Sequence, residues 1–180
     1  MILAQLDAVG LLLTQAFFIQ LDSLIDASKQ TVTILDVEPN RSIAVEDRIS
    51  LQDIRNANNY YPGFFLRVAI RDYSEAMRSP RSAAFYCYRA IESLRQFFEQ
   101  MLLIDDRNFA WKIFREHIPI NEEDTRKVGE LAKADRHGEP FAITGDARFF
   151  CIRIACAAIV YFVEIISASL ADGIKVNKPI

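Results

Sequence analysis

Hydrophobic residues follow different periods on the two sides of residue 60. Between residues 31 and 46, β-branched residues partly alternate with polar ones around the turn segment Glu38–Arg41, which predicts a β-hairpin. The apolar run Leu11–Ile25 fits a helix or a strand by its period, and we interpret it as a helix. We therefore divide the chain into an N-terminal appendage, residues 1–60, and a helical domain, residues 61–180.

The helical domain begins with two long helices. From Leu66 to Met77, apolar residues recur three and four apart, which predicts the first. The second should run from Pro80 to about Leu103, with Ser79 as its N-cap. Its apolar seam is typical of a helix that packs nearly parallel to another. The seam contains Ala84, Cys87, Ile91, Leu94, Phe98 and Met101.

Three more helices are predicted after this pair. A short one spans residues 109–116 after the N-cap Asn108, and another begins at Asn121 and ends just before Gly138. The last runs from near Thr144 to about Leu170 and is apolar on nearly all sides. The predicted fold is therefore mainly α: a four- to five-helix bundle with a small N-terminal appendage that combines a β-hairpin and a helix.

Composition narrows the class of protein. A chain of 180 residues that is 51% hydrophobic can bury a full core, and its net charge of −3 argues against a surface devoted to nucleic acid. The three cysteines are odd in number and form no Cys-x-x-Cys pair, so we interpret them as reduced core residues. No positively charged segment precedes the first apolar run, and the later run Ile154–Val163 is shorter than the ~20 residues that span a bilayer. We expect a cytoplasmic protein without membrane contact.

The segment Ala134–Pro140 carries the strongest candidate chemistry. It holds Arg136 and His137, one of only two histidines, between two predicted helices. The imidazole can titrate near neutral pH and act as an acid or a base. Alternatively, Arg136, His137 and Gly138 form the C-terminal cap of the preceding helix, and both interpretations can hold together.

The polar side of the second long helix is the other candidate. Its residues Tyr88, Arg89, Glu92, Arg95 and Glu99 are spaced to form ion pairs along a solvated face. Because aromatic residues occur nearly all round this helix, the same side can instead be covered, and Arg89 and Glu92 then need partners. We interpret His117, at the end of the predicted helix that contains Trp111, as a structural residue and not as a metal ligand. We expect no metal site and no cofactor.

The run Tyr88–Arg95 on a long helix, followed about 40 residues later by Arg136, His137 and an apolar closing helix, resembles the HEPN-like helical proteins over about residues 64–171. The resemblance implies a bundle that dimerises through its long helices. Many such proteins are metal-independent ribonucleases of toxin, antiphage or abortive-infection systems. In those enzymes an arginine and a histidine, separated by four to six residues, face the dimer cleft and act on the RNA backbone with a ribose hydroxyl as the nucleophile.

This chain departs from that Arg-x4-6-His signature. The positions that should hold the arginine before His137 are Glu130, Leu131 and Ala132, and the nearby arginine is the adjacent Arg136. We therefore favour a non-catalytic HEPN-like homodimer in a bacterial stress or defence system, which binds RNA, a nucleotide or a partner protein through Arg89, Glu92, Arg136 and His137.

Two other functions stay open at this stage. One is an atypical metal-independent ribonuclease, in which His137 is the acid or base and Arg136 or Arg89 stabilises the phosphorane. The other is a purely structural, dimerising helical domain.

Overall fold

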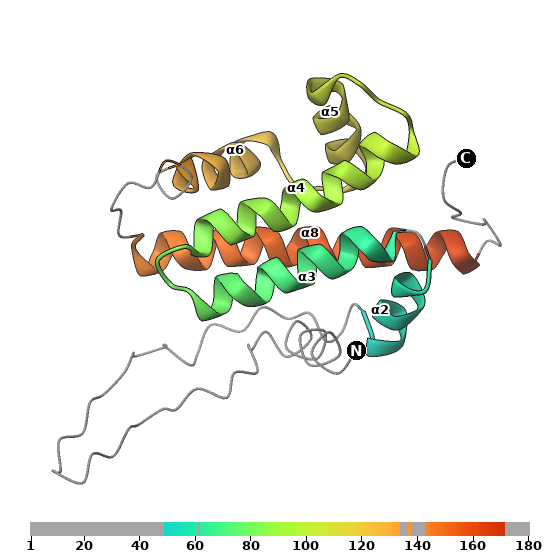
Figure 1. Cartoon of the computed structure of the whole chain (residues 1–180), viewed down its shortest axis with the longest axis horizontal. Coiled ribbons are helices and arrows are strands. Elements are labelled where there is room, and N and C mark those ends of the chain that lie inside the picture. Colours follow the sequence, from blue (N-terminus) through green and yellow to red (C-terminus); the bar gives the residue numbers. More distant parts are fainter. Residues whose placement is uncertain (1–48, 61, 134–136, 138–142, 172–180) are drawn as a thin grey trace, which may run out of the picture.

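The computed structural model describes residues 49–60, 62–133, 137 and 143–171, and this part of the chain is mainly helical (Figure 1). Its described residues form six helices and no strand. The expected helix at residues 11–25 and hairpin at residues 31–46 lie outside the described residues. The helices are α2 (Leu51–Asn58), α3 (Gly63–Arg78), α4 (Ala83–Met101), α5 (Arg107–His117), α6 (Glu122–Leu131) and α8 (Gly145–Ala171).

Helices α3 and α4 form an antiparallel hairpin at the centre of the bundle (Figure 1). The prediction of α3 is confirmed, but α4 begins at Ala83 and not at Pro80. Ser79 is the C-cap of α3, where its N–H donates to Glu75 O at 2.8 Å. The chain must reverse direction within a few residues, and the Ser82 N–H bond to Ser79 O at 3.1 Å closes that turn.

The predicted apolar seam of α4 packs against other helices of the same chain. Ala84, Cys87, Ile91, Leu94 and Phe98 are all buried, between α3 on one side and α8 on the other. Edge-to-face ring contacts connect α4 to its neighbours, including Phe97 with Phe162 of α8 at 5.1 Å between centroids. The seam is therefore part of the hydrophobic core within a single chain.

Helix α8 is the long closing helix that the sequence predicts, and it lies alongside α3 and α4 in Figure 1. By length and composition alone, its segment Gly145–Leu170 is long and apolar enough to cross a membrane, and 61% of its most apolar window is buried inside the structure. The prediction that this apolar segment is too short to span a bilayer is therefore wrong, because the segment extends past Arg153 and Glu164. Its burial is typical of a core helix.

Helices α5 and α6 show how local side chains set helix starts. Asp106 caps α5, because its carboxylate accepts hydrogen bonds from the backbone N–H groups of Asn108 at 2.8 Å and Phe109 at 3.4 Å. The N-cap expected at Asn108 is therefore two residues too late. Asn121 caps α6 as predicted, with its side-chain oxygen 2.6 Å from the Asp124 backbone nitrogen.

Helix α2 was not predicted. Ser50 and Asp53 form a reciprocal capping box at its start, and Ile54 and Ala57 are fully buried against α3 and α8. The boundary that the sequence analysis places at residue 60 falls after this helix, so α2 adds core residues from the N-terminal side of that boundary.

Candidate functional site

Arg89 is the candidate residue that the structure places most firmly. It lies on α4, and its Nε is 3.3 Å from Oδ2 of Asp72 on α3. The Asp72 side chain is only 2% exposed, whereas that of Arg89 is 41% exposed. The Arg71 Nη2 also lies 3.7 Å from Asp72 Oδ1. A buried carboxylate therefore anchors Arg89 while leaving much of its side chain at the surface.

The environment of Asp72 explains why it needs these arginines. Burial raises the pKa of the Asp72 carboxyl above its ordinary value, while the charges of Arg89 and Arg71 act in the opposite direction. Asp72 Oδ2 has no hydrogen bond to any part of the chain that the structure describes, although Arg89 is close. The contact between Arg89 and Asp72 is therefore an ion pair of charge proximity, without ideal hydrogen-bond geometry.

Two aromatic rings lie near the guanidinium of Arg89. Its guanidinium carbon is 5.5 Å from the centre of the Phe85 ring and 5.9 Å from that of Tyr86, both within cation–π distance. The two rings meet edge to face at 5.3 Å and are each half-buried. We call Arg71, Phe85, Tyr86 and Arg89 the arginine–aromatic surface. Two partly exposed cations and two partly exposed rings are available there to a ligand.

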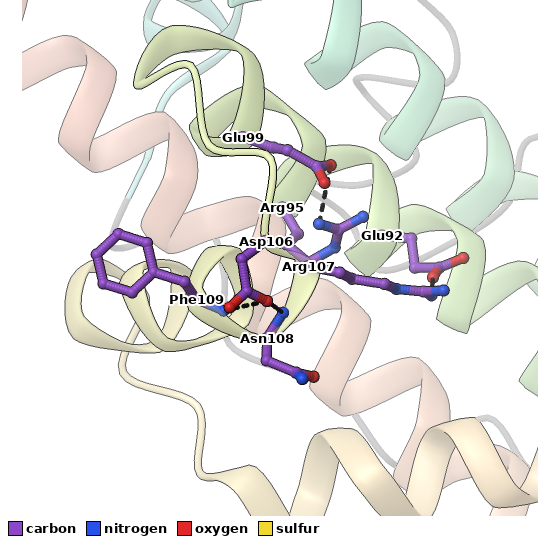
Figure 2. Close-up of polar contacts among 7 residues, drawn as sticks. All are labelled: Glu92, Arg95, Glu99, Asp106, Arg107, Asn108 and Phe109. Carbon is purple, nitrogen blue, oxygen red and sulfur yellow. Dashed lines mark hydrogen bonds and ion pairs between the residues drawn. The ribbon is translucent and has the colours of Figure 1, made fainter.

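Glu92 points to a different neighbour. It forms an ion pair with Arg107, at the first turn of α5, as Figure 2 shows. The expectation that a covered Arg89 and Glu92 need partners is thus met by α3 for Arg89 and by α5 for Glu92. The two residues do not pair with each other along the helix, so the prediction of ion pairs along a solvated face is wrong for these two residues.

Arg95 is the functional-looking residue that the sequence placed wrongly. The spacing of polar residues predicts that Arg95 lies on the polar side of the helix, but it is only 4% exposed. Its Nη1 donates to Glu99 Oε2 at 2.9 Å, as Figure 2 shows. Its guanidinium carbon also lies 5.4 Å from the centre of the Trp111 ring. The Arg95–Glu99 pair predicted from spacing is confirmed, but α5 covers it. Arg95 therefore fastens α5 to α4.

His137 and Arg136 do not join this cluster in the described structure. Arg136 lies outside the described residues. His137 is exposed, and its backbone N–H donates to Lys133 O at 3.1 Å. Helix α6 ends at Leu131, with Ala132 as its C-cap, so the end predicted just before Gly138 is too late. Among the described residues, no side chain of Arg89 or Glu92 forms a hydrogen bond or ion pair with His137.

The other candidate nucleophiles and ligands have structural roles. His117 Nδ1 is 2.9 Å from Ile113 O, and since a carbonyl only accepts, this ring nitrogen carries the proton. Cys87, Cys151 and Cys156 are free and buried, and burial raises the pKa of Cys151 to about 11. Such thiols are protonated at neutral pH and are poor nucleophiles. The described residues contain no group of three or more His, Cys, Asp or Glu side chains able to hold a metal ion.

Comparison with known proteins identifies a family. The family model described as the C-terminal domain of a domain of unknown function, DUF8168, matches residues 51–167 of the chain. This match covers more than half of the sequence, from the start of α2 into the last turns of α8, and the chain therefore belongs to this family. No curated protein and no solved structure matches it.

Proposed function

We propose that this member of the DUF8168 C-terminal domain family is a non-catalytic, HEPN-like helical module that binds single-stranded RNA. The observation that supports this function best is the anchored Arg89, a partly exposed arginine whose guanidinium lies within cation–π distance of both Phe85 and Tyr86. The central hairpin of α3 and α4 and the long closing helix α8 are consistent with the resemblance to HEPN-like proteins.

The chemistry of the arginine–aromatic surface suits RNA. An arginine head that is held at Nε by Asp72 keeps its Nη groups directed for hydrogen bonds to phosphate oxygens. Phe85 and Tyr86 offer ring faces and edges on which an unpaired base can stack, which contributes about 1–3 kcal/mol per base in proteins that bind single strands. Arg71, 59% exposed beside the same carboxylate, supplies a second cation.

The described geometry favours binding over cleavage. Arg89 is held by Asp72 and, among the described residues, forms no hydrogen bond or ion pair with His137, the histidine of the predicted HEPN motif. The chain has no arginine at the spacing of the Arg-x4-6-His signature, where HEPN ribonucleases hold the group that stabilises the phosphorane, and the adjacent Arg136 lies outside the described residues. Binding by the arginine–aromatic surface does not need His137.

The test is fluorescence anisotropy of a labelled single-stranded RNA, titrated with the purified full chain in a buffer containing EDTA. Arg71→Ala removes an exposed cation, and we expect binding to weaken about 3- to 10-fold with a shallower salt dependence. Arg89→Lys keeps a charge opposite Asp72 but lacks the planar fork, and we expect a similar loss. Arg126→Ala, on the exposed side of α6, is the matched control and should bind like the wild type.

The same samples, run on a denaturing gel, separate binding from cleavage. We expect the RNA to remain intact with the wild type and with His137→Ala. Cleavage by the wild type that His137→Ala abolishes would refute the non-catalytic proposal and identify an atypical ribonuclease. Absence of binding, or equal losses for Arg71→Ala and Arg126→Ala, would refute the assignment of this surface.

A further inference from the structure

One side of α8 stays accessible although the helix is apolar nearly all round. Residues at spacings of three and four share this side, which is exposed or half-buried, while the positions between them are mostly fully buried against the bundle. The residues form a stripe about 27 Å long, at 1.5 Å per residue. We call it the α8 stripe; its members are Phe150, Arg153, Ala157, Tyr161, Glu164 and Ala168.

The α8 stripe is complementary to itself when it is reversed. If two copies of α8 pack antiparallel about a two-fold axis near residue 159, residue numbers that face each other add to 317 or 318. Phe150 then faces Ala168, Arg153 faces Glu164, and Ala157 faces Tyr161 of the second copy. Each pair joins a large side chain with a small one or a cation with an anion. The two-fold axis makes each pair occur twice.

This complementarity selects one orientation. In a parallel pair, Arg153 would face a second Arg153 and Glu164 a second Glu164, which are repulsive arrangements. Ala157 and Ala168 leave room for the facing Tyr161 and Phe150 rings at the 8–10 Å axis separation usual for packed helices. The apolar seam of α4 is buried within one chain and is not available to a second copy. The α8 stripe, in contrast, is at least partly accessible along its length.

Interactions within the chain are compatible with this surface. Tyr161 and Glu164 each take part in an interaction in their own chain, and both are only half-buried, so part of each side chain stays accessible. The ring of Phe150 lies 4.5 Å from the Lys127 ammonium and 5.9 Å from the guanidinium carbon of Arg153. These contacts orient Phe150 and Arg153 without burying Arg153, which is exposed.

We propose that the α8 stripe is the docking surface for a second copy of this chain, in an antiparallel α8–α8 pair held by two Arg153–Glu164 ion pairs. This inference does not depend on RNA binding. The charges and sizes of its side chains favour a second copy as the partner, because the stripe supplies both members of every contact pair.

A charge-swap experiment tests the pair directly. The dimer dissociation constant of the full chain is measured by sedimentation or light scattering across micromolar concentrations. Arg153→Glu places a glutamate against Glu164 twice, and Glu164→Arg places an arginine against Arg153 twice. We expect each variant alone to dimerise at least about tenfold more weakly than the wild type. An equimolar mixture of the two should recover dimers, because each chain then meets its opposite charge.

The mixture also controls for folding, since two misfolded chains would not rescue each other. Arg126→Glu makes the same charge change on α6, outside the α8 stripe, and should dimerise like the wild type. A wild-type protein that stays monomeric at all concentrations would overturn the proposal. A dimer that neither charge reversal weakens, or a mixture of the two variants that fails to associate, would also overturn it.

Discussion

The end of α4 offers a sharp test of backbone strain. Leu103 has a φ of 51°, in the left-handed region, and its side chain is 77% exposed. The Ile104 N–H donates to Glu99 O at 2.9 Å, which is the longer bond of a Schellman motif with Leu103 at the position that glycine usually occupies. We predict that Leu103→Gly relieves this strain while losing little packing.

The magnitude follows from three contributions. A left-handed conformation costs a residue with a side chain about 1–2 kcal/mol, which glycine avoids. Glycine also lowers the free energy of unfolding by about 0.5–1 kcal/mol, because it gives the unfolded chain greater conformational freedom. The buried quarter of the Leu103 side chain contributes roughly 0.5 kcal/mol. These contributions nearly cancel, so Leu103→Gly should leave the free energy of unfolding within about 1 kcal/mol of the wild type.

Leu102→Gly is the matched control. Leu102 precedes Leu103 and is 55% exposed, but its φ of −102° is comfortable for leucine. Its replacement relieves no strain, so we expect a loss of about 1–2 kcal/mol. Urea unfolding followed by circular dichroism should therefore find Leu103→Gly more stable than Leu102→Gly by about 2 kcal/mol, or about 4–8 °C in melting temperature. Equal losses would show that the left-handed backbone at Leu103 is not strained.

Two further predictions concern Gly63, Gly145 and Asp72. Gly63→Ala should lower the free energy of unfolding, measured in urea, by about 1–3 kcal/mol or more, because a Cβ there would lie 2.3 Å from Asn58 O. A Cβ at Gly145 meets nothing within 4 Å, so Gly145→Ala should be neutral or stabilising. Similar effects of the two variants would contradict this reasoning. Burial raises the pKa of Asp72 above 3.8, so the folded protein holds this proton more tightly than the unfolded chain. The contribution of Asp72 to stability is thus greatest below pH 3.8 and decreases as the pH rises through the raised pKa. The free energy of unfolding of the wild type minus that of Asp72→Asn should fall over that range, and a rise would refute the direction.

The sequence predicts helices well here because their signals are local. The period of apolar residues located α3, α4 and α8 to within a few residues at most boundaries, and the side chain of Asn121 marked the start of α6. The predicted helix starts were wrong where two capping residues compete. Ser79 precedes a proline but is the C-cap of α3. Asp106 lies just before Asn108 and is the N-cap of α5. Both candidates have suitable side chains, and only the path of the chain decides between them.

The partners of charged residues depend on tertiary contacts, which the period of apolar residues in the sequence does not reveal. Arg89, Glu92 and Arg95 are equally polar in the sequence, yet they meet Asp72 of α3, Arg107 of α5 and Trp111 of α5. Asp72 itself lies within a helical stripe and gives no signal of its burial. The pairing of Arg89 with Asp72 requires α3 and α4 to be packed in a known register, which a sequence pattern does not fix.

Arg95 shows why a polar residue on a predicted helix is weak evidence for a solvated face. A guanidinium with a single ion-pair partner and a buried Nε is costly inside a protein, so its burial needs compensation. Glu99 neutralises its charge, and the Trp111 ring covers its face, which only the return of α5 over α4 can provide. Arg89 has the opposite arrangement, with its anion buried and its cation exposed. The difference between an arginine that fastens two helices and one that is available to a ligand therefore lies in which member of each ion pair the neighbouring helix covers.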